Sequence, residues 1–264
     1  MSTVSTITLD SRTIAVSDSG GTGYPLLLAH GFGLDSSMFG GQADLAPSSR
    51  VIAWDAPGHG ASPVGPEPFT FWDLARTQIE LLDALRIERA VVGGVSQGGF
   101  IALRTALVAP GRVSGLVLMD TESAALGAED AQSYGRLFAA LAEYGPTPEL
   151  TTGLAAQIVG DHPAAEKWAG VWRERGVPLG APVDCLVHRD DVTDRLSGIT
   201  APALVLCGEN DHSIPRERQE RMRRGLTGAG ELHVVPGAGH SPALTHPDAV
   251  NRLLESFLDD VLGT

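Results

Sequence analysis

Cysteine is scarce in this sequence: its 264 residues include only Cys185 and Cys207. Two cysteines cannot form the framework of a disulfide-rich domain, and these two lack any metal-ligand spacing. We interpret both as reduced, ordinary residues of a core or a lid. Because an H-E-x-x-H motif and a Cys/His cluster are also absent, the sequence predicts neither a metal site nor another cofactor.

Long apolar runs and basic runs are missing as well. No stretch approaches the roughly 18 apolar residues of a membrane-spanning helix, and the first residues lack the charged and apolar regions of a signal peptide. Acidic residues outnumber basic ones by 32 to 19, and the basic residues form no run that could hold a phosphate backbone. We therefore expect a soluble, cytoplasmic protein that acts on a small molecule and binds neither nucleic acid nor membrane. The oligomeric state stays open, a homo-oligomer included.

Apolar residues make up 43% of the chain, and their spacing indicates the secondary structure. Short apolar runs alternate with longer stretches of helical periodicity, which is typical of parallel strands joined by crossover helices. Segments 7–9 and 13–16 instead alternate apolar with polar residues, which predicts an antiparallel pair at one sheet edge. The expected fold is α/β with a mixed, mostly parallel sheet. The strand runs are Leu26 to Ala29, Val51 to Trp54, Ala90 to Gly93, Leu116 to Met119, Ala203 to Cys207 and Leu232 to Val235.

The strand pattern stops in the middle of the chain. There helical patterns take over, interrupted by glycines and prolines. We interpret residues 123–196 as a helical cap, or lid, inserted into a core formed by residues 1–122 and 197–264.

The strongest functional signal is Gly94-Val95-Ser96-Gln97-Gly98, which matches G-x-S-x-G. It lies between an apolar strand run and a helical pattern, the context in which this motif places a serine at a strained strand-to-helix turn. Glycines two residues before and after the serine let the strand and helix backbones pass closely. Because so short a motif recurs by chance, a glycine-rich turn with an incidental serine stays the alternative at this point.

A second glycine-lined loop, His30-Gly31-Phe32-Gly33, follows an earlier apolar run. It can bring the backbone N–H of Phe32 to the point that the N–H of Gln97 faces, so that the two form an oxyanion hole. The helix that begins after Ser96 also directs the positive end of its dipole at this point.

A serine nucleophile needs a histidine as base and an acid that orients the histidine. Among eight histidines His240 is best placed, because it follows the last strand run and sites of α/β sheets collect at the carboxyl ends of strands. Asp211 and Asp120 both follow strand runs and precede His240, as the order serine, acid, histidine requires. We favour Asp211, whose Gly-Glu-Asn-Asp turn would lift the carboxylate toward His240, and expect Asp120 to cap the entry to the lid. Glu209 and Glu122 are minor alternatives.

Together these motifs resemble the α/β-hydrolase superfamily, in its cap-bearing branch of small esterases, lactonases, carbon–carbon bond hydrolases and perhydrolases. The resemblance implies the α/β-hydrolase fold, a mostly parallel eight-stranded sheet flanked by helices with an inserted helical cap. It covers about residues 5–122 and 200–262 and leaves the cap unmatched. The matching motifs, in chain order, are residues 30–33, the turn Asp55-Ala56-Pro57-Gly58-His59-Gly60, residues 94–98, and the loops of Asp211 and His240.

The resemblance also implies acyl transfer without a cofactor, with Ser96, Asp211 and His240 as the catalytic triad and Phe32 and Gln97 as the oxyanion hole. Haloalkane dehalogenases and epoxide hydrolases of this fold carry aspartate at the elbow, so the serine argues against both. Enol-lactonases and perhydrolases often carry methionine after the nucleophile, where this chain has Gln97. That departure leaves the subfamily open.

The sequence therefore predicts a serine hydrolase that cleaves a carboxylic ester or lactone of a small, largely apolar substrate. Carbon–carbon bond hydrolysis or a lyase reaction on the same triad, perhydrolase or haloperoxidase-like activity, and a ligand receptor on the hydrolase fold stay as alternatives. In the cap, Trp168, Trp172 and Phe138 are candidate substrate-binding residues, although such residues more often pack lid helices on the core. Leu137, Leu141 and Leu154 are further apolar candidates.

Overall fold

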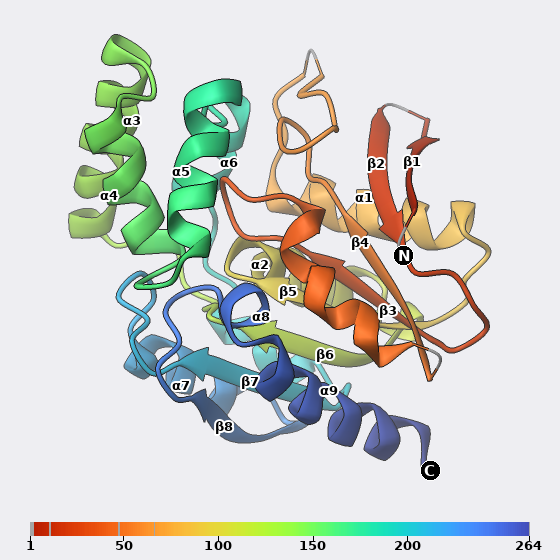
Figure 1. Ribbon diagram of the computed structural model, residues 1–264. Helices are drawn as coiled ribbons and strands as arrows, with labels where there is room; N and C mark the ends of the chain where they lie inside the picture. Colours follow the sequence, from red (N-terminus) through yellow and green to blue (C-terminus); the bar gives the residue numbers. More distant parts are fainter. Residues whose placement is uncertain (1–2, 11, 47, 66, 264) are drawn as a thin grey trace.

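The computed structural model describes residues 3–10, 12–46, 48–65 and 67–263. Within these residues eight strands form one sheet in the order β1-β2-β4-β3-β5-β6-β7-β8 (Figure 1). The predicted antiparallel edge is confirmed, because β1 pairs antiparallel with β2 and β2 pairs antiparallel with β4. All the other pairings are parallel. The strands are β1 Thr3–Thr8, β2 Thr13–Asp18, β3 Tyr24–Ala29, β4 Ser49–Trp54, β5 Ala90–Val95, β6 Val113–Met119, β7 Ala203–Gly208 and β8 Ala229–Val235.

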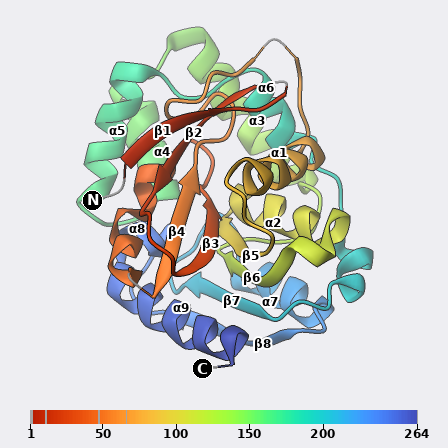
Figure 2. The same ribbon diagram turned by 90° about the vertical axis from the view of Figure 1, so that its right-hand side faces the viewer.

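Helices cover both faces of this sheet, which explains why its central strands are apolar throughout. Every residue of β5 and of β7 is buried. Helices α1, α2 and α7 lie on one face, and α8, α9 and the 3₁₀ segment η1 lie on the other (Figure 2). The covering segments are η1 Ser36–Leu45, α1 Phe71–Ala84, α2 Gln97–Val108, η2 Pro110–Arg112, α7 Arg216–Gly225, α8 Pro242–Thr245 and α9 Pro247–Leu262.

Local sequence sets the ends of these helices. Thr70 and Asp73 form a capping box at the start of α1, in which each side chain accepts a hydrogen bond from the other residue's backbone N–H. The apolar stripe of α1 then packs against α2, which itself lies on β5 and β6. The helix after Ser96 is thereby held firmly on the sheet.

Between β6 and β7 the chain is wholly described and contains helices instead of strands. The α-helices among them gather beyond the strand ends, at the upper left of Figure 1, whereas the final 3₁₀ segment contacts α7 and α2. They fall in the segment predicted to be a cap, and the division of the chain into core and cap stays our interpretation. They are α3 Ala128–Tyr144, α4 Pro148–Ile158, α5 Ala164–Arg175, α6 Ala181–Val187 and the 3₁₀ segment η3 Thr193–Gly198.

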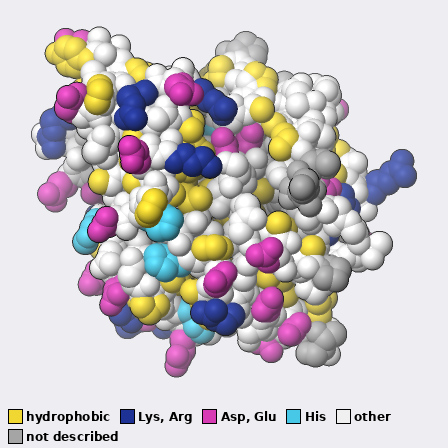
Figure 3. All heavy atoms as spheres, in the orientation of Figure 1, with side chains coloured by type: hydrophobic (Ala, Val, Ile, Leu, Met, Phe, Trp, Pro, Cys, Tyr) yellow, Lys and Arg dark blue, Asp and Glu magenta, His cyan; other side chains and the backbone are white. Residues whose placement is uncertain are grey.

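On the face shown in Figure 3, acidic and basic side chains are interspersed over the sheet domain and the cap helices. The cap is joined to the sheet by a buried ion pair: Arg189 Nη2 lies 2.7 Å from Glu122 Oε1, and both side chains are 3% exposed. Glu122 therefore serves this contact rather than orienting a histidine. None of the helices in the described ranges combines the length and apolarity of a membrane span.

Candidate active site

Ser96 lies in the turn between β5 and α2. Its backbone has φ 54° and ψ −113°, a conformation that costs energy for a residue with a side chain. Two hydrogen bonds hold it there: the Ser96 N–H donates to Met119 O at 2.9 Å, and Thr121 Oγ1 donates to Ser96 O at 2.8 Å. Gly94 and Gly98 have no room for a Cβ, which would collide with the carbonyl group of Ala29. The glycines of the motif thus have a steric cause.

The loop after β3 passes beside this turn. His30 fixes the loop, because its Nε2 accepts the N–H of Ala56 at 2.9 Å and its Nδ1 donates to Gly31 O at 2.8 Å. Burial lowers the pKa of His30 and so favours the neutral ring that these two bonds require. Neither the N–H of Phe32 nor that of Gln97 donates to another residue in the described part of the chain. Two backbone donors next to Ser96 are thus available to a ligand.

His240 and Asp211 come from the loops after β8 and β7. The Nδ1 of His240 lies 2.9 Å from Asp211 Oδ1, and both side chains are buried. The other bonds to Asp211 come from the N–H groups of Ser213 and Ile214 at 2.9 and 3.1 Å and from Gln219 Nε2 at 3.0 Å. Burial raises the pKa of Asp211, but the adjacent His240 and the hydrogen bonds from His240, Asp120 and Ile214 outweigh it and lower the pKa overall. Asp211 therefore favours the anionic form and is hydrogen-bonded to the imidazole.

Asp120 follows β6 and lies behind this pair. It is fully buried, its Oδ1 accepts the N–H of Gly208 at 2.8 Å, and its carboxyl group is hydrogen-bonded to Asp211 when protonated. Burial, and then the negative charge of Asp211, raise the pKa of Asp120 well above its usual value. Asp120 therefore keeps its proton to a higher pH than an ordinary aspartate does. It does not cap the entry to the lid, because its side chain faces β7 and Asp211 instead.

Asp120, Asp211 and His240 also bring one potential ligand atom each within 4.8 Å of the others. The set is a poor site for a cation, because the raised pKa of Asp120 favours its protonated form and the Nδ1 of His240 is already hydrogen-bonded to Asp211. The exposed Glu209 accepts the N–H of Gly237 at 2.9 Å and so braces the histidine loop from outside.

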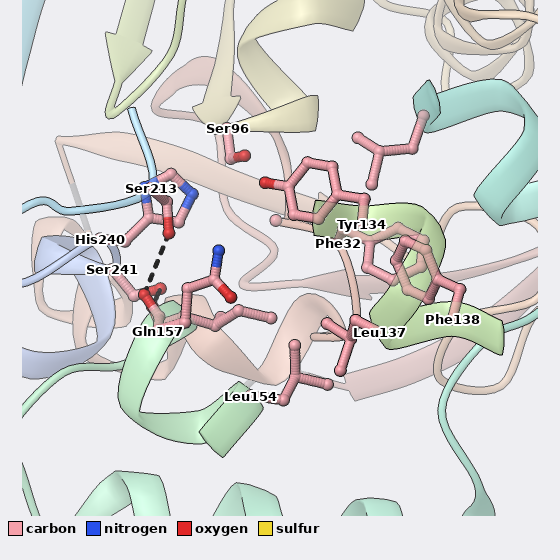
Figure 4. Close-up of a pocket in the computed structure, with 13 residues that line it drawn as sticks. Phe32, Ser96, Tyr134, Leu137, Phe138, Leu154, Gln157, Ser213, His240 and Ser241 are labelled. Carbon is pink, nitrogen blue, oxygen red and sulfur yellow. Dashed lines mark hydrogen bonds between the residues drawn. The ribbon is translucent and has the colours of Figure 1, made fainter. Parts of the chain in front are cut away.

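Ser96 and His240 open into one pocket of about 470 Å³, counted with its open mouth. Figure 4 shows the imidazole of His240 and the hydroxyl of Ser96 facing the same space. The walls are mostly apolar and come largely from the cap helices. The lining residues are Gly31, Phe32, Ser96, Tyr134, Leu137, Phe138, Leu154, Gln157, Ile158, Leu186, Ser213, His240 and Ser241.

A sequence model of the alpha/beta hydrolase family matches residues 26–253. The chain belongs to the alpha/beta hydrolase family. It is 31% identical over 257 residues to a pimeloyl-[acyl-carrier protein] methyl ester esterase of Pectobacterium atrosepticum, covering 88% of this chain and 93% of the relative.

Solved structures agree with this assignment. A thermophilic esterase from Thermogutta terrifontis is 30% identical, with a TM-score of 0.87 over 98% of this hydrolase and 99% of that chain. The N-acyl homoserine lactone degrading enzyme Est816 is 26% identical, with a TM-score of 0.81 over 96% of this chain and 100% of that one.

The predicted substrate-binding residues of this alpha/beta hydrolase lie in two places. Phe138 lines the pocket of Ser96, as do Leu137 and Leu154. Trp168 and Trp172 lie outside it and line a neighbouring depression. Trp172 lies there because its buried indole N–H needs a hydrogen-bond partner and donates to Gly33 O at 2.6 Å.

Several pocket residues were not anticipated from the sequence of the hydrolase. Ser241 Oγ donates to Ile158 O at 2.7 Å, and Ser213 Oγ donates to Gln157 O at 3.1 Å. The carboxyl end of α4 is thereby tied to the loops of His240 and Asp211. The contacts join segments more than 50 residues apart, and no local pattern signals them.

Proposed function

We propose that this alpha/beta hydrolase is a serine hydrolase that cleaves a carboxylic ester or lactone of a small, largely apolar substrate. The observation that carries the proposal is the hydrogen bond from His240 to Asp211 at the mouth of a pocket that also holds the strained Ser96. That arrangement supplies a base in the same pocket as the hydroxyl, and most of the pocket lining is apolar.

In the proposed mechanism Ser96 Oγ attacks the substrate carbonyl while His240 Nε2 takes its proton. Asp211 holds the ring in the tautomer whose Nε2 is free and stabilises the imidazolium that forms. The N–H groups of Phe32 and Gln97 receive the negative charge on the carbonyl oxygen, supported by the amino-terminal end of α2. His240 then returns the proton to the leaving group, and water hydrolyses the acyl-enzyme.

The walls of the pocket support an uncharged substrate. Its described lining contains no Lys, Arg, Asp or Glu side chain, and most of it is aliphatic or aromatic. The relatives point the same way in their names, since one is a methyl ester esterase, one is an esterase and one degrades a lactone.

The test is hydrolysis of short and medium p-nitrophenyl esters and of simple lactones. We expect wild-type activity that falls by at least about 10³-fold in Ser96→Ala, because the nucleophile is lost. Ser37→Ala, a change at an exposed serine outside the pocket, is the control and should leave activity unchanged. Hydrolysis that persists in Ser96→Ala, or a folded wild type that cleaves none of these substrates, would overturn the proposal.

A further inference from the structure

Two uncharged polar side chains project into the otherwise apolar pocket. Tyr134 comes from α3 and Gln157 from α4, and the mechanism above uses neither. Neither side chain forms a hydrogen bond with another residue in the described ranges. Their polar atoms are therefore free to bind a ligand.

Both groups are aimed at the reaction centre. In Figure 4 the hydroxyl of Tyr134 points toward Ser96, and the amide of Gln157 points into the same space from the side of His240. A ligand carbonyl attacked by Ser96 would have both groups nearby.

The segments that carry the two side chains are also held in place. The backbone carbonyl oxygens of Gln157 and its neighbour Ile158 accept hydrogen bonds from Ser213 and Ser241, which fix the end of α4. The ring of Tyr134 packs on Phe138 with centroids 5.9 Å apart, and Phe138 packs on Phe32 at 5.3 Å. Groups held in this way lose little freedom when they bind.

The chemistry of the two groups selects the ligand. Burial raises the pKa of Tyr134, so its hydroxyl keeps the proton and can donate. The amide of Gln157 can donate through its nitrogen and accept through its oxygen. With no cationic side chain in the lining, a carboxylate would lack a counter-charge, whereas an amide or ketone carbonyl matches the donors.

We propose that Tyr134 and Gln157 form a polar subsite that binds an uncharged amide or ketone carbonyl a few bonds from the scissile carbonyl. The preferred substrates are then esters or lactones that carry such a group, an inference that rests on the proposed ester-cleaving function. A plain alkyl chain would displace water from both polar groups and leave them unpaired, which discriminates against it.

Two matched pairs of esters test the subsite. Methyl N-hexanoylglycinate is compared with methyl nonanoate, which has the same chain length without the amide. 2-Acetamidoethyl butyrate is compared with pentyl butyrate, which places the same contrast in the alcohol part. Hydrolysis is measured by the release of protons. We expect kcat/KM of the wild type to be about 10-fold or more higher for the amide-bearing ester in at least one pair.

Two conservative variants test the residues. Tyr134→Phe removes only a hydroxyl, and Gln157→Met keeps the side-chain length while removing the amide. In the ester pair for which the wild type shows a preference, each variant should bring the ratio of the two kcat/KM values toward one. Hydrolysis of the plain ester should persist. Tyr144→Phe changes an exposed tyrosine on the same helix and should leave the ratio at its wild-type value.

The proposal is overturned if neither pair shows a preference, or if the preference survives in both variants. Failure of the subsite can be told apart from failure of the proposed function. The proposed function fails if hydrolysis of plain esters does not depend on Ser96. Circular dichroism and the melting temperature of each variant show that it is folded, and either variant alone suffices for the comparison.

Discussion

At the scale of single residues, two aspartates close to one histidine have pKa values shifted in opposite directions. Asp211 bonds directly to His240 and has a lowered pKa, whereas Asp120 lies behind it and has a raised pKa. Both follow a strand and both precede His240, so their positions in the sequence are equivalent. Burial and hydrogen bonding separate them, because Asp120 is sealed among β6, β7 and Asp211 while Asp211 collects four donors.

This difference predicts unequal effects of the same substitution. Asp211→Asn should lower kcat for ester hydrolysis by about 10³- to 10⁴-fold, because an amide cannot stabilise the imidazolium and favours the wrong tautomer. Asp120→Asn should cost less than about 10-fold, since the amide keeps the shape of the side chain and His240 is hydrogen-bonded to Asp211 rather than to Asp120. Steady-state kinetics on one p-nitrophenyl ester compares the two variants. The reverse order of losses would make Asp120 the orienting acid.

At the scale of elements, the cap helices are fixed to the loops that carry the site. The carboxyl end of α4 accepts hydrogen bonds from Ser213 and Ser241, and Trp172 of α5 donates to Gly33 beside Phe32. Helix α3 contributes Tyr134, Leu137 and Phe138 to the pocket. The packing of α3 and α4 against the strand ends therefore determines the shape of the substrate space.

The anchor from α5 can be measured. Trp172→Phe leaves the buried carbonyl of Gly33 without its donor, so we expect a loss of about 1–3 kcal/mol in the free energy of unfolding. Trp168→Phe, on the same helix, trims a buried indole that donates no hydrogen bond to a described residue and should cost less. Urea denaturation with an unchanged m-value gives both losses. Equal losses would mean that this hydrogen bond does not stabilise the fold.

At the scale of the whole molecule, Asp120 links stability to pH. In the unfolded chain its pKa is about 3.9, and in the folded chain burial and Asp211 raise it well above that. Its contribution to stability is therefore complete below the unfolded pKa and is lost as pH rises through the folded pKa. This buried carboxyl group thus makes the fold less stable as the pH rises.

Asp120→Asn removes this titration. The melting temperature of the variant minus that of the wild type should become more positive as pH rises from about 5 towards about 9. In the wild type, the unfolded chain ionises this carboxyl at a lower pH than the folded chain does, so rising pH favours unfolding, and the variant lacks this effect. Differential scanning calorimetry measures the difference, with Asp10→Asn at an exposed position as the control. A difference that stays constant with pH would show that burial does not raise the pKa of Asp120 into this range.

The sequence by itself determined the order of strands and helices and the residues at the strand ends. Apolar runs mark buried strands, and the glycines around Ser96 mark a close passage of backbones, because both follow from local sterics and burial. Asp211 and His240 could be located for the same reason, since each follows a recognisable strand run.

Only the tertiary structure decided what those residues touch. It separated Asp120 from Asp211 by the groups that surround each carboxyl, and it directed Trp172 to Gly33 rather than into the pocket. It also brought Tyr134 and Gln157 together beside Ser96, although both lie on helices with no motif. Periodicity shows which face of a helix is buried, but the partner of that face depends on packing between segments far apart in the chain.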